Sequence, residues 1–233
     1  MNRGRGRANQ SLKEQPKTPA SGAAAQSTRE RLLHEARKIL EEGGYAAASV
    51  QAIADRSGVA AGALYRHFSS KAELFVELVR DAAKRDIAAM KAAAASGGSV
   101  ERLEAIVATF ARGALRKRRL AWALVYEPVD SLVDAERLVY RREYCRRMAK
   151  LLRQGIAAGE IPDQNVELSA AAIVGAIAES LVGPLSPVGA ISSDEDVIAT
   201  LVRFCRRSLG VPDNVALRSV TGPGDPARAR SQR

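Results

Sequence analysis

Apolar residues recur every three to four positions along most of this 233-residue chain, which is the spacing of amphipathic α-helices. The longer segments with this pattern span about 27–42, 70–95, 100–115, 130–158, 165–182 and 193–209. Shorter segments at about 49–56, 60–66 and 120–126 complete the set, and strand-like alternation is scarce. Aromatic residues make up only 4% of the chain, so the core must consist mainly of Ala, Leu, Val and Ile. The pattern predicts an all-α fold of about nine helices.

Two short apolar patterns separated by a glycine turn stand out between Ser49 and Lys71. Ser49 can cap the first of these helices with its hydroxyl oxygen. Gly58 can take the positive φ that a tight turn between helices requires. Ser70 and Glu73 have the spacing of a capping box, which starts a longer helix. Two short helices joined by a glycine turn are typical of a helix-turn-helix, whose second helix enters the DNA major groove.

The spacing of this stretch matches a known signature at the following positions: Val50, Ile53, Ala54, Gly58, Val59, Gly62, Leu64, Tyr65, Phe68, Lys71 and Leu74. With these residues the chain resembles the TetR family of transcriptional repressors. The resemblance implies a three-helix DNA-binding domain followed by a helical ligand-binding and dimerisation domain. We therefore expect the helix-turn-helix domain over 27–72 and the second domain over 73–210.

The two ends of the chain have a different composition. Residues 1–26 and 211–233 are rich in Gly, Arg, Ser and Pro, with few large apolar side chains to offset the entropy of ordering. Both are predicted to be disordered tails, the first of them basic. Arg3, Arg5 and Arg7 could form an arm that contacts DNA, or the tail could be a solvated basic segment.

Positive charge is concentrated toward the N-terminus. The net charge is +10, and residues 1–71 carry 12 Lys and Arg against 6 Asp and Glu. A polyanion is therefore expected to bind at this end.

Motifs for other classes of protein are missing from the sequence. The chain has no P-loop, no GxGxxG, no GxSxG and no HExxH, and neither Cys145 nor Cys205 lies in a zinc-binding pattern. We therefore expect no enzyme activity, no metal and no cofactor. The sequence pattern predicts no membrane span, which would need a run of roughly 18 apolar residues, and it predicts no signal peptide. The expectation is a cytoplasmic protein without a membrane partner.

The start of the second short helix would face the base edges. Ala60, Ala61, Gly62 and Ala63 occupy these positions, and alanine can only touch a thymine methyl or permit close approach. Side-chain readout of bases would then depend on Arg66 or Gln51, or on DNA shape.

The family resemblance also implies a set of phosphate contacts. Tyr65, His67 and Lys71 would donate to phosphate oxygens, and Ser49 would assist at the opposite wall of the groove. The alternative for each is an ordinary polar surface residue.

Five large aromatic side chains of the second domain are the best candidates to line an effector cavity. These are Phe110, Trp122, Tyr126, Tyr140 and Tyr144, each of which could instead fill core space. Glu179 could face the cavity, pair across a dimer interface or point to solvent.

The segments 165–182 and 193–209 are apolar on more faces than a monomer could bury. The resemblance implies that they pair with the same two helices of a second copy in a homodimer.

These observations predict a sequence-specific transcriptional regulator rather than an enzyme. The expected activity is repression at a pseudo-palindromic operator in double-stranded DNA, with release by an unidentified small-molecule effector. The alternative is a DNA-binding protein without such an effector, either architectural or controlled by a protein partner. A low preference for specific over random DNA would favour that alternative.

Overall fold

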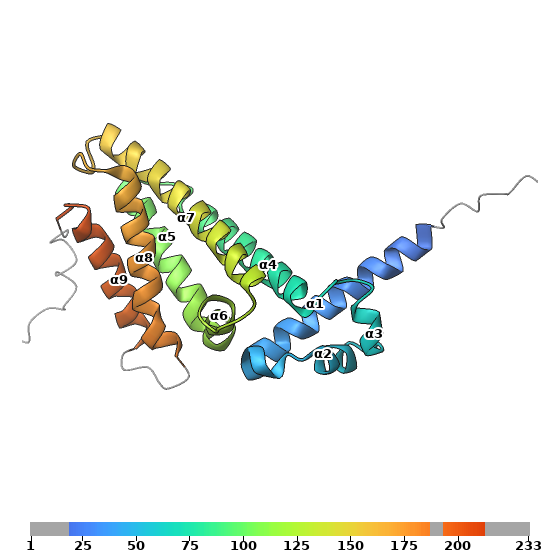
Figure 1. Cartoon of the computed structure of the whole chain (residues 1–233). Coiled ribbons are helices and arrows are strands. Elements are labelled where there is room, and N and C mark those ends of the chain that lie inside the picture. The colour runs from blue at the N-terminus through green and yellow to red at the C-terminus, as the bar shows by residue number, and fades with distance from the viewer. Residues whose placement is uncertain (1–18, 187–192, 213–233) are drawn as a thin grey trace, which may run out of the picture.

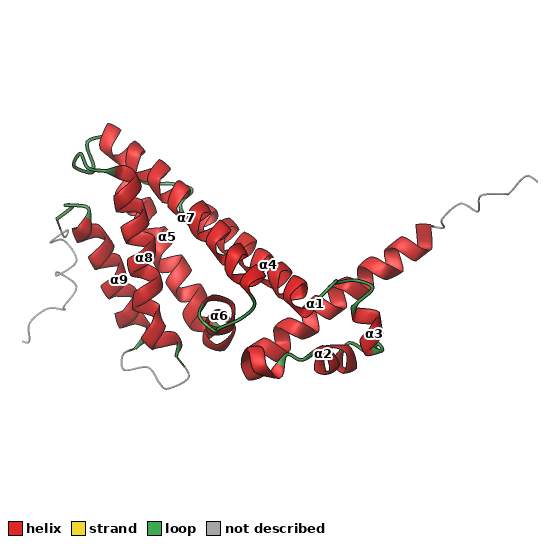
Figure 2. Cartoon of the chain, viewed as in Figure 1, coloured by secondary structure: helices red, strands yellow, loops and turns green. Residues whose placement is uncertain are grey.

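The computed structural model of the chain describes residues 19–186 and 193–212, and over these ranges all regular structure is α-helical (Figures 1 and 2). The helices in this part of the chain are α1 (Pro19–Ala47), α2 (Val50–Arg56), α3 (Ala61–Leu64), α4 (Lys71–Ala93), α5 (Ser99–Arg116), α6 (Arg118–Val125), α7 (Ser131–Ala157), α8 (Val166–Leu185) and α9 (Asp194–Ser208). The prediction of an all-α fold with about nine helices is confirmed.

The helices form two bodies joined by α4 (Figure 1). α1, α2 and α3 lie at one end with the start of α4, and α5 to α9 form a larger bundle at the other end. α4 and α7 run side by side in the same direction, and Arg80 of α4 forms two hydrogen bonds with Glu136 of α7, at 2.8 and 3.1 Å. α4 is therefore a continuous rod between the two bodies.

The N-terminal body has an apolar core that extends onto α6. Leu32 and Leu40 of α1, Ile53 of α2 and Leu64 of α3 are completely buried, together with Phe68 and Phe75 at 1% exposure. Complete burial of such a side chain contributes roughly 1.5–3 kcal/mol. The two short helices are therefore held by packing against α1 and α4.

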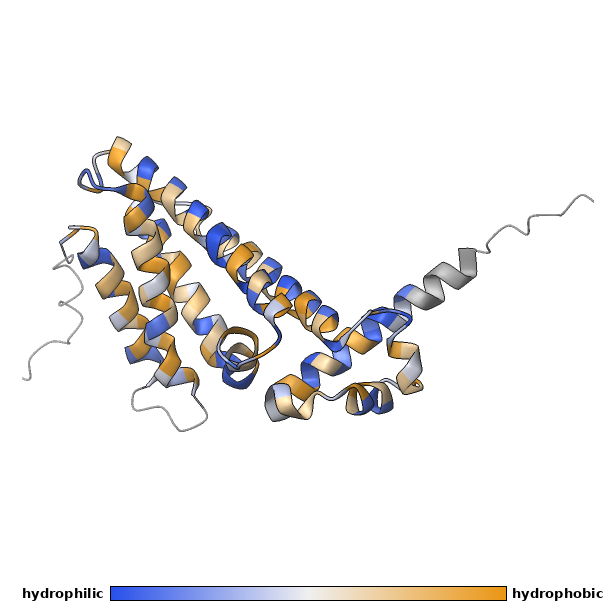
Figure 3. Ribbon diagram, in the orientation of Figure 1, coloured by the Kyte–Doolittle hydropathy of each residue, from blue (hydrophilic) through white to orange (hydrophobic). Residues whose placement is uncertain are grey.

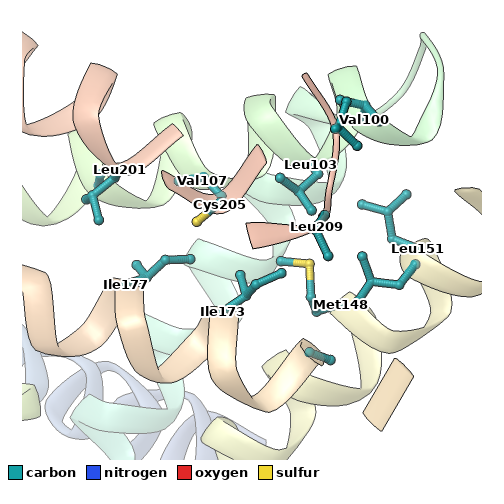
Figure 4. Packing of buried hydrophobic residues seen from close by; sticks show 14 of the residues in the cluster. Val100, Leu103, Val107, Met148, Leu151, Ile173, Ile177, Leu201, Cys205 and Leu209 are labelled. Carbon is teal, nitrogen blue, oxygen red and sulfur yellow. The ribbon is translucent and has the colours of Figure 1, made fainter. Parts of the chain in front are cut away.

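The larger body has a second core, which Figure 4 shows from close by. Leu103 and Val107 of α5 meet Met148 and Leu151 of α7, and α8 and α9 close the cluster with Ile173, Ile177, Leu201 and Cys205. Apolar and polar residues alternate along most helices, as Figure 3 shows, which is the pattern read from the sequence.

Predicted caps form at several helix starts. The Ser49 hydroxyl oxygen accepts from the Ala52 N–H at 3.1 Å, and the Ser70 hydroxyl oxygen accepts from the Glu73 N–H at 3.1 Å. The Glu73 carboxylate accepts from the backbone and the hydroxyl of Ser69, and these bonds lower its pKa.

The structure corrects both predicted tails. Residues 19–26 belong to α1, since Pro at the first helical position followed by several alanines favours a helix. Residues 1–18, with Arg3, Arg5 and Arg7, lie outside the described residues. At the other end Val211 is 8% exposed and the Arg206 guanidinium donates to the Pro212 carbonyl at 2.7 Å. Residues 213–233 also lie outside the description.

α8 is the most apolar helix of the described chain. α8 has 20 residues and a mean hydropathy of 1.7, so by length and composition it could cross a membrane, which the sequence reading did not recognise. The core helix of a soluble protein passes the same test. Only 28% of the relevant window of α8 is buried within this chain, so much apolar surface is left uncovered.

The regular part of α1 ends in a sharp corner at Gly44, and this corner contacts the larger body. Gly44 has φ 73° and ψ −169°, a conformation that is essentially restricted to glycine. The Glu127 carboxylate accepts from the Tyr45 N–H at 2.8 Å, and Arg119 donates to the Gly43 carbonyl at 3.0 Å. A Cβ on Gly44 would lie 2.8 Å from a Glu127 carboxylate oxygen.

Gly44→Ala is therefore expected to lower the free energy of unfolding by roughly 1–3 kcal/mol, because alanine would have to adopt this conformation. Gly113→Ala is the matched control: it lies inside α5, has open space around its Cβ position, and is expected to stabilise by about 0.5–1 kcal/mol. Urea unfolding followed by circular dichroism measures both. Equal stability of Gly44→Ala and the unmodified protein would contradict the prediction.

Candidate functional site

The helix-turn-helix is built by α2, the turn after it and α3. Gly58 takes φ 65° in this turn, as predicted, and its position is exposed. Ile53, Leu64 and Phe68 are buried and fix the two helices against the rest of the N-terminal body. The remaining side chains of α3 and of the turn after it are free to form an outer surface.

That outer surface is small and carries few polar groups. Ala60 and Gly62 are exposed and Ala61 is half-buried, while Tyr65 is 55% exposed and Arg66 is also exposed. The prediction that Ala63 approaches base edges is wrong. Ala63 is only 5% exposed because it shares the inner face of α3 with Leu64.

Two candidates on α2 lie at its beginning. Ser49 is exposed, and its hydroxyl oxygen accepts from the backbone, which leaves the hydroxyl proton to donate. Gln51 is exposed, and its amide donates to the Asp55 carboxylate at 2.7 Å. Base readout by Gln51 and phosphate contact by Ser49 stay predictions.

Lys71, the first residue of α4, is less free than the sequence suggested. Its ammonium lies 4.0 Å from the centre of the Tyr45 ring and 3.4 Å from the Tyr45 carbonyl oxygen. Burial lowers the pKa of Lys71. An ammonium has three N–H donors, so a phosphate contact would add to the Tyr45 contacts. Of the other two predicted phosphate contacts, Tyr65 is exposed and His67 is half-buried.

A cavity of about 700 Å³ lies between α4, α5, α6, α7 and α8. Its apolar lining is Val79, Ala82, Ala83, Ile87, Met90, Ala94, Ile106, Val107, Phe110, Leu124, Val125, Leu138, Met148, Leu151, Val174, Ile177 and Ala178. A cavity of this size fits a small organic molecule.

Only part of the predicted aromatic set lines this cavity. Phe110, Tyr140 and Tyr144 do, and the rings of Phe110 and Tyr144 meet edge to face at 6.0 Å. Trp122 and Tyr126 are not in the lining, so the prediction is wrong for them. Their rings pack together at 5.4 Å, and the Tyr126 hydroxyl donates to the Ala178 carbonyl. Burial raises the pKa of Tyr126 to about 12.

Glu179 is also outside the cavity lining. It is exposed on α8, which removes the cavity from the three alternatives that the sequence left open.

The sequence reading missed Asp86, which is in the cavity lining. Asp86 follows Ala82 and precedes Met90 by one helical turn each, so it lies on the inward face of α4. Burial raises its pKa to about 6, against the opposing effect of Arg85. A charged residue at helical spacing within an apolar stripe was the available signal.

The lining also contains more cations than anions. The basic side chains are Lys91, Arg102, Arg137, Arg141, Arg147 and Lys150, and the acidic ones are Asp86 and Asp134. Arg102 and Arg137 donate to backbone carbonyls, and Arg147 pairs with Glu143.

The other three cations, Lys91, Arg141 and Lys150, have no hydrogen bond or ion pair with any described residue. These three side chains are therefore available to pair with a bound anion.

Within the described ranges, no group of three or more His, Cys, Asp or Glu side chains is placed to hold a metal ion. Cys205 is buried and Cys145 is half-buried.

Comparison with known proteins places both sites in one family. Residues 32–78 match the model of bacterial regulatory proteins of the tetR family, and residues 96–208 match a tetracyclin repressor-like C-terminal domain. The chain is 36% identical over 102 residues to the transcriptional repressor KstR of Mycolicibacterium smegmatis, covering 43% of this chain and 50% of KstR. It thus spans about half the length of that relative.

A second relative and a solved structure match a larger share of this chain. The transcriptional repressor KstR2 of Rhodococcus jostii is 32% identical over 160 residues, which is 66% of this chain and 77% of KstR2. The regulator FadR of Bacillus subtilis, solved with stearoyl-CoA, superposes with a TM-score of 0.66 at 19% identity, over 79% of this chain and 99% of FadR. The fold, the two matched domains and the KstR2 identity agree with the resemblance read from residues 49–74: the chain belongs to the TetR family of bacterial regulatory proteins.

Proposed function

We propose that this protein is a homodimeric, sequence-specific repressor that a small-molecule effector releases from its operator DNA. The observation that carries the proposal is that α4 belongs to both sites. Its first residue, Lys71, lies at the DNA-binding unit, and its residues from Val79 onward line the cavity. A molecule in the cavity would therefore contact the same rod that carries the DNA-binding unit. Such a protein acts in the cytoplasm, where its DNA is.

A homodimer is supported by the outer surface of α8 and α9. Leu168 of α8 is 68% exposed and Phe204 of α9 is 51% exposed, although α8 is the most apolar helix by mean hydropathy in the described chain. We propose that 165–182 and 193–209 pair with the same segments of a second copy. Two recognition helices would then reach half-sites about 34 Å apart on one face of DNA.

A series of contacts runs from the cavity wall to the DNA-binding unit. Arg137 of the lining donates to the Leu124 carbonyl at 2.8 Å and to the Glu127 carbonyl at 3.1 Å. The Glu127 carboxylate holds the Tyr45 N–H, and Tyr45 in turn contacts the Lys71 ammonium. A ligand that shifts Arg137 would displace a connected set of groups. Because linkage is reciprocal, DNA would weaken effector binding by the same factor.

The effector class follows from the lining. Apolar walls and three cations without partners fit a molecule with a long apolar body and one anionic group. FadR of Bacillus subtilis, which has the same fold, was solved with stearoyl-CoA, a molecule of this kind. We propose an amphiphilic anion as the effector and use stearate as its simplest probe.

Arg66→Ala tests the DNA-binding surface. Its guanidinium is exposed, so loss of a base contact is expected to cost about 1–3 kcal/mol, roughly 5- to 150-fold in operator affinity, and to relax sequence preference at one position. Arg112→Ala is the matched control, because it removes the same charge from an exposed position on α5. The operator is first found by selecting bound genomic fragments at moderate salt, and affinities are then measured by fluorescence anisotropy.

Enrichment of fragments without a shared palindrome would contradict the repressor proposal. It would favour the alternative of an architectural DNA-binding protein.

Lys91→Gln combined with Lys150→Gln tests the charge of the effector. Loss of both ammonium groups is expected to weaken stearate binding about 10- to 100-fold at low salt, and by less at high salt because the groups are exposed. Lys84→Gln with Arg112→Gln removes two cations outside the lining and is expected to leave affinity unchanged. Isothermal titration calorimetry measures both. Equal weakening by the two pairs would show a general charge effect and contradict the site.

Glu127→Ala tests the contacts between the two sites. The variant is expected to bind stearate with unchanged affinity, while the factor by which stearate weakens operator binding falls from the usual ~5–150 toward 1. Asp163→Ala removes a carboxylate from an exposed loop and serves as the control. Operator titrations with and without stearate give the factor. An unchanged factor in Glu127→Ala would rule out this route.

A further inference from the structure

Asp86 is an anion in the cavity wall, on the inward, mainly apolar face of α4. Ala82, Ala83, Ile87 and Met90 surround it along α4, and no described residue forms a hydrogen bond or ion pair with its carboxylate. Asp86 is half-buried, so solvent still reaches it in the empty cavity. A ligand that displaces this solvent and offers no donor would leave the ionised carboxylate unsatisfied, which is costly. Asp86 therefore disfavours the binding of any ligand that has no hydrogen-bond donor near its carboxylate.

Tyr144, on the neighbouring helix α7, is also part of the cavity lining. Burial and the charge of Asp86 both raise the pKa of Tyr144, so its hydroxyl stays protonated. Besides its cations, the lining therefore contains one carboxylate acceptor and one hydroxyl, on α4 and α7.

A cationic ligand group is a poor partner for Asp86 in this setting. Arg141 and Arg147 lie within one turn of Tyr144 on α7 and line the same cavity, so a second cation would be repelled. A neutral donor avoids this repulsion and still satisfies the carboxylate. The hydroxyl group is the simplest neutral donor that an apolar molecule can carry.

We propose that Asp86 selects effectors that carry a hydroxyl group on their apolar body, at a distance from the anionic end. This inference rests on the amphiphilic anion proposed above and adds a second recognition point. Lys91 is five residues after Asp86 on α4, about 7.5 Å along the helix axis, and Lys150 lies toward the same end of α7. With the reach of a lysine side chain added, the hydroxyl belongs near the middle of an 18-carbon chain.

The test compares 10-hydroxystearate, 2-hydroxystearate and stearate, each below its critical micelle concentration, by isothermal titration calorimetry. The unmodified protein is expected to bind 10-hydroxystearate about 10- to 100-fold more tightly than stearate, because a hydrogen bond to a charged group has that value. The 2-hydroxy acid, whose hydroxyl lies beside the carboxylate, is expected to bind like stearate.

Asp86→Leu is expected to remove or reverse the preference for 10-hydroxystearate while it keeps or improves stearate binding. Asp86→Asn, which keeps an acceptor, is expected to retain part of the preference. Lys84→Leu, on an exposed position of the same helix, is expected to behave like the unmodified protein. Retained operator binding by Asp86→Leu shows that the variant is folded.

Two results overturn the inference alone: equal affinity of the unmodified protein for 10-hydroxystearate and stearate, or a preference that survives in Asp86→Leu. Binding of none of the three acids overturns the proposed effector class, and the inference with it. The failure of the class and the failure of the hydroxyl preference are therefore separate outcomes.

Discussion

The contact between Glu127 and the corner at Gly44 and Tyr45 joins the two bodies, beside the apolar packing of α1 on α6. The Glu127 carboxylate accepts a hydrogen bond from the Tyr45 N–H at 2.8 Å. The carboxylate fits beside the corner because Gly44 has no Cβ there. Tyr45 then offers its ring and carbonyl to Lys71, at the start of α4. Glu127, just after α6, thus contacts the end of α1 directly and the start of α4 through Tyr45. Without it, the DNA-binding unit would be held mainly by the rod of α4 and the packing of α1 on α6.

The two cores differ in a way that suits their tasks. The N-terminal core is filled by fully buried Leu, Ile and Phe side chains, so α2 and α3 have one position relative to α1. The larger body instead leaves about 700 Å³ between α4 and α7, and polar side chains reach into that space. A filled core resists deformation, whereas helices around a cavity have room to shift. Movement caused by a ligand would therefore occur in the larger body and be transmitted to a rigid DNA-binding unit.

Local features of the fold could be predicted from the sequence, because each depends on residues near one another in the chain. The caps at Ser49 and Ser70 and the turn at Gly58 are of this kind. The cavity could not, since it requires knowing which face of α7 meets α4. Because aromatic residues are scarce, Trp122 and Tyr126 were predicted to line the cavity, but they pack against each other and α8. Asp86, a small charged residue that was not predicted, is part of the lining. Ala63 failed for a similar reason, because a four-residue helix gives too little pattern to define its inner face.

The exposed surface of α3 also limits how this protein can distinguish its operator. Ala60 and Gly62 offer no side-chain donors, so each recognition helix has Arg66 and Tyr65 as its main polar groups. A single DNA-binding unit would then gain little over random DNA, and useful specificity would require both units of a dimer to bind at once. An effector would not have to block either unit. A change in their separation would be enough, because each unit alone would bind weakly. α4 is the element through which a molecule in the cavity would alter that separation.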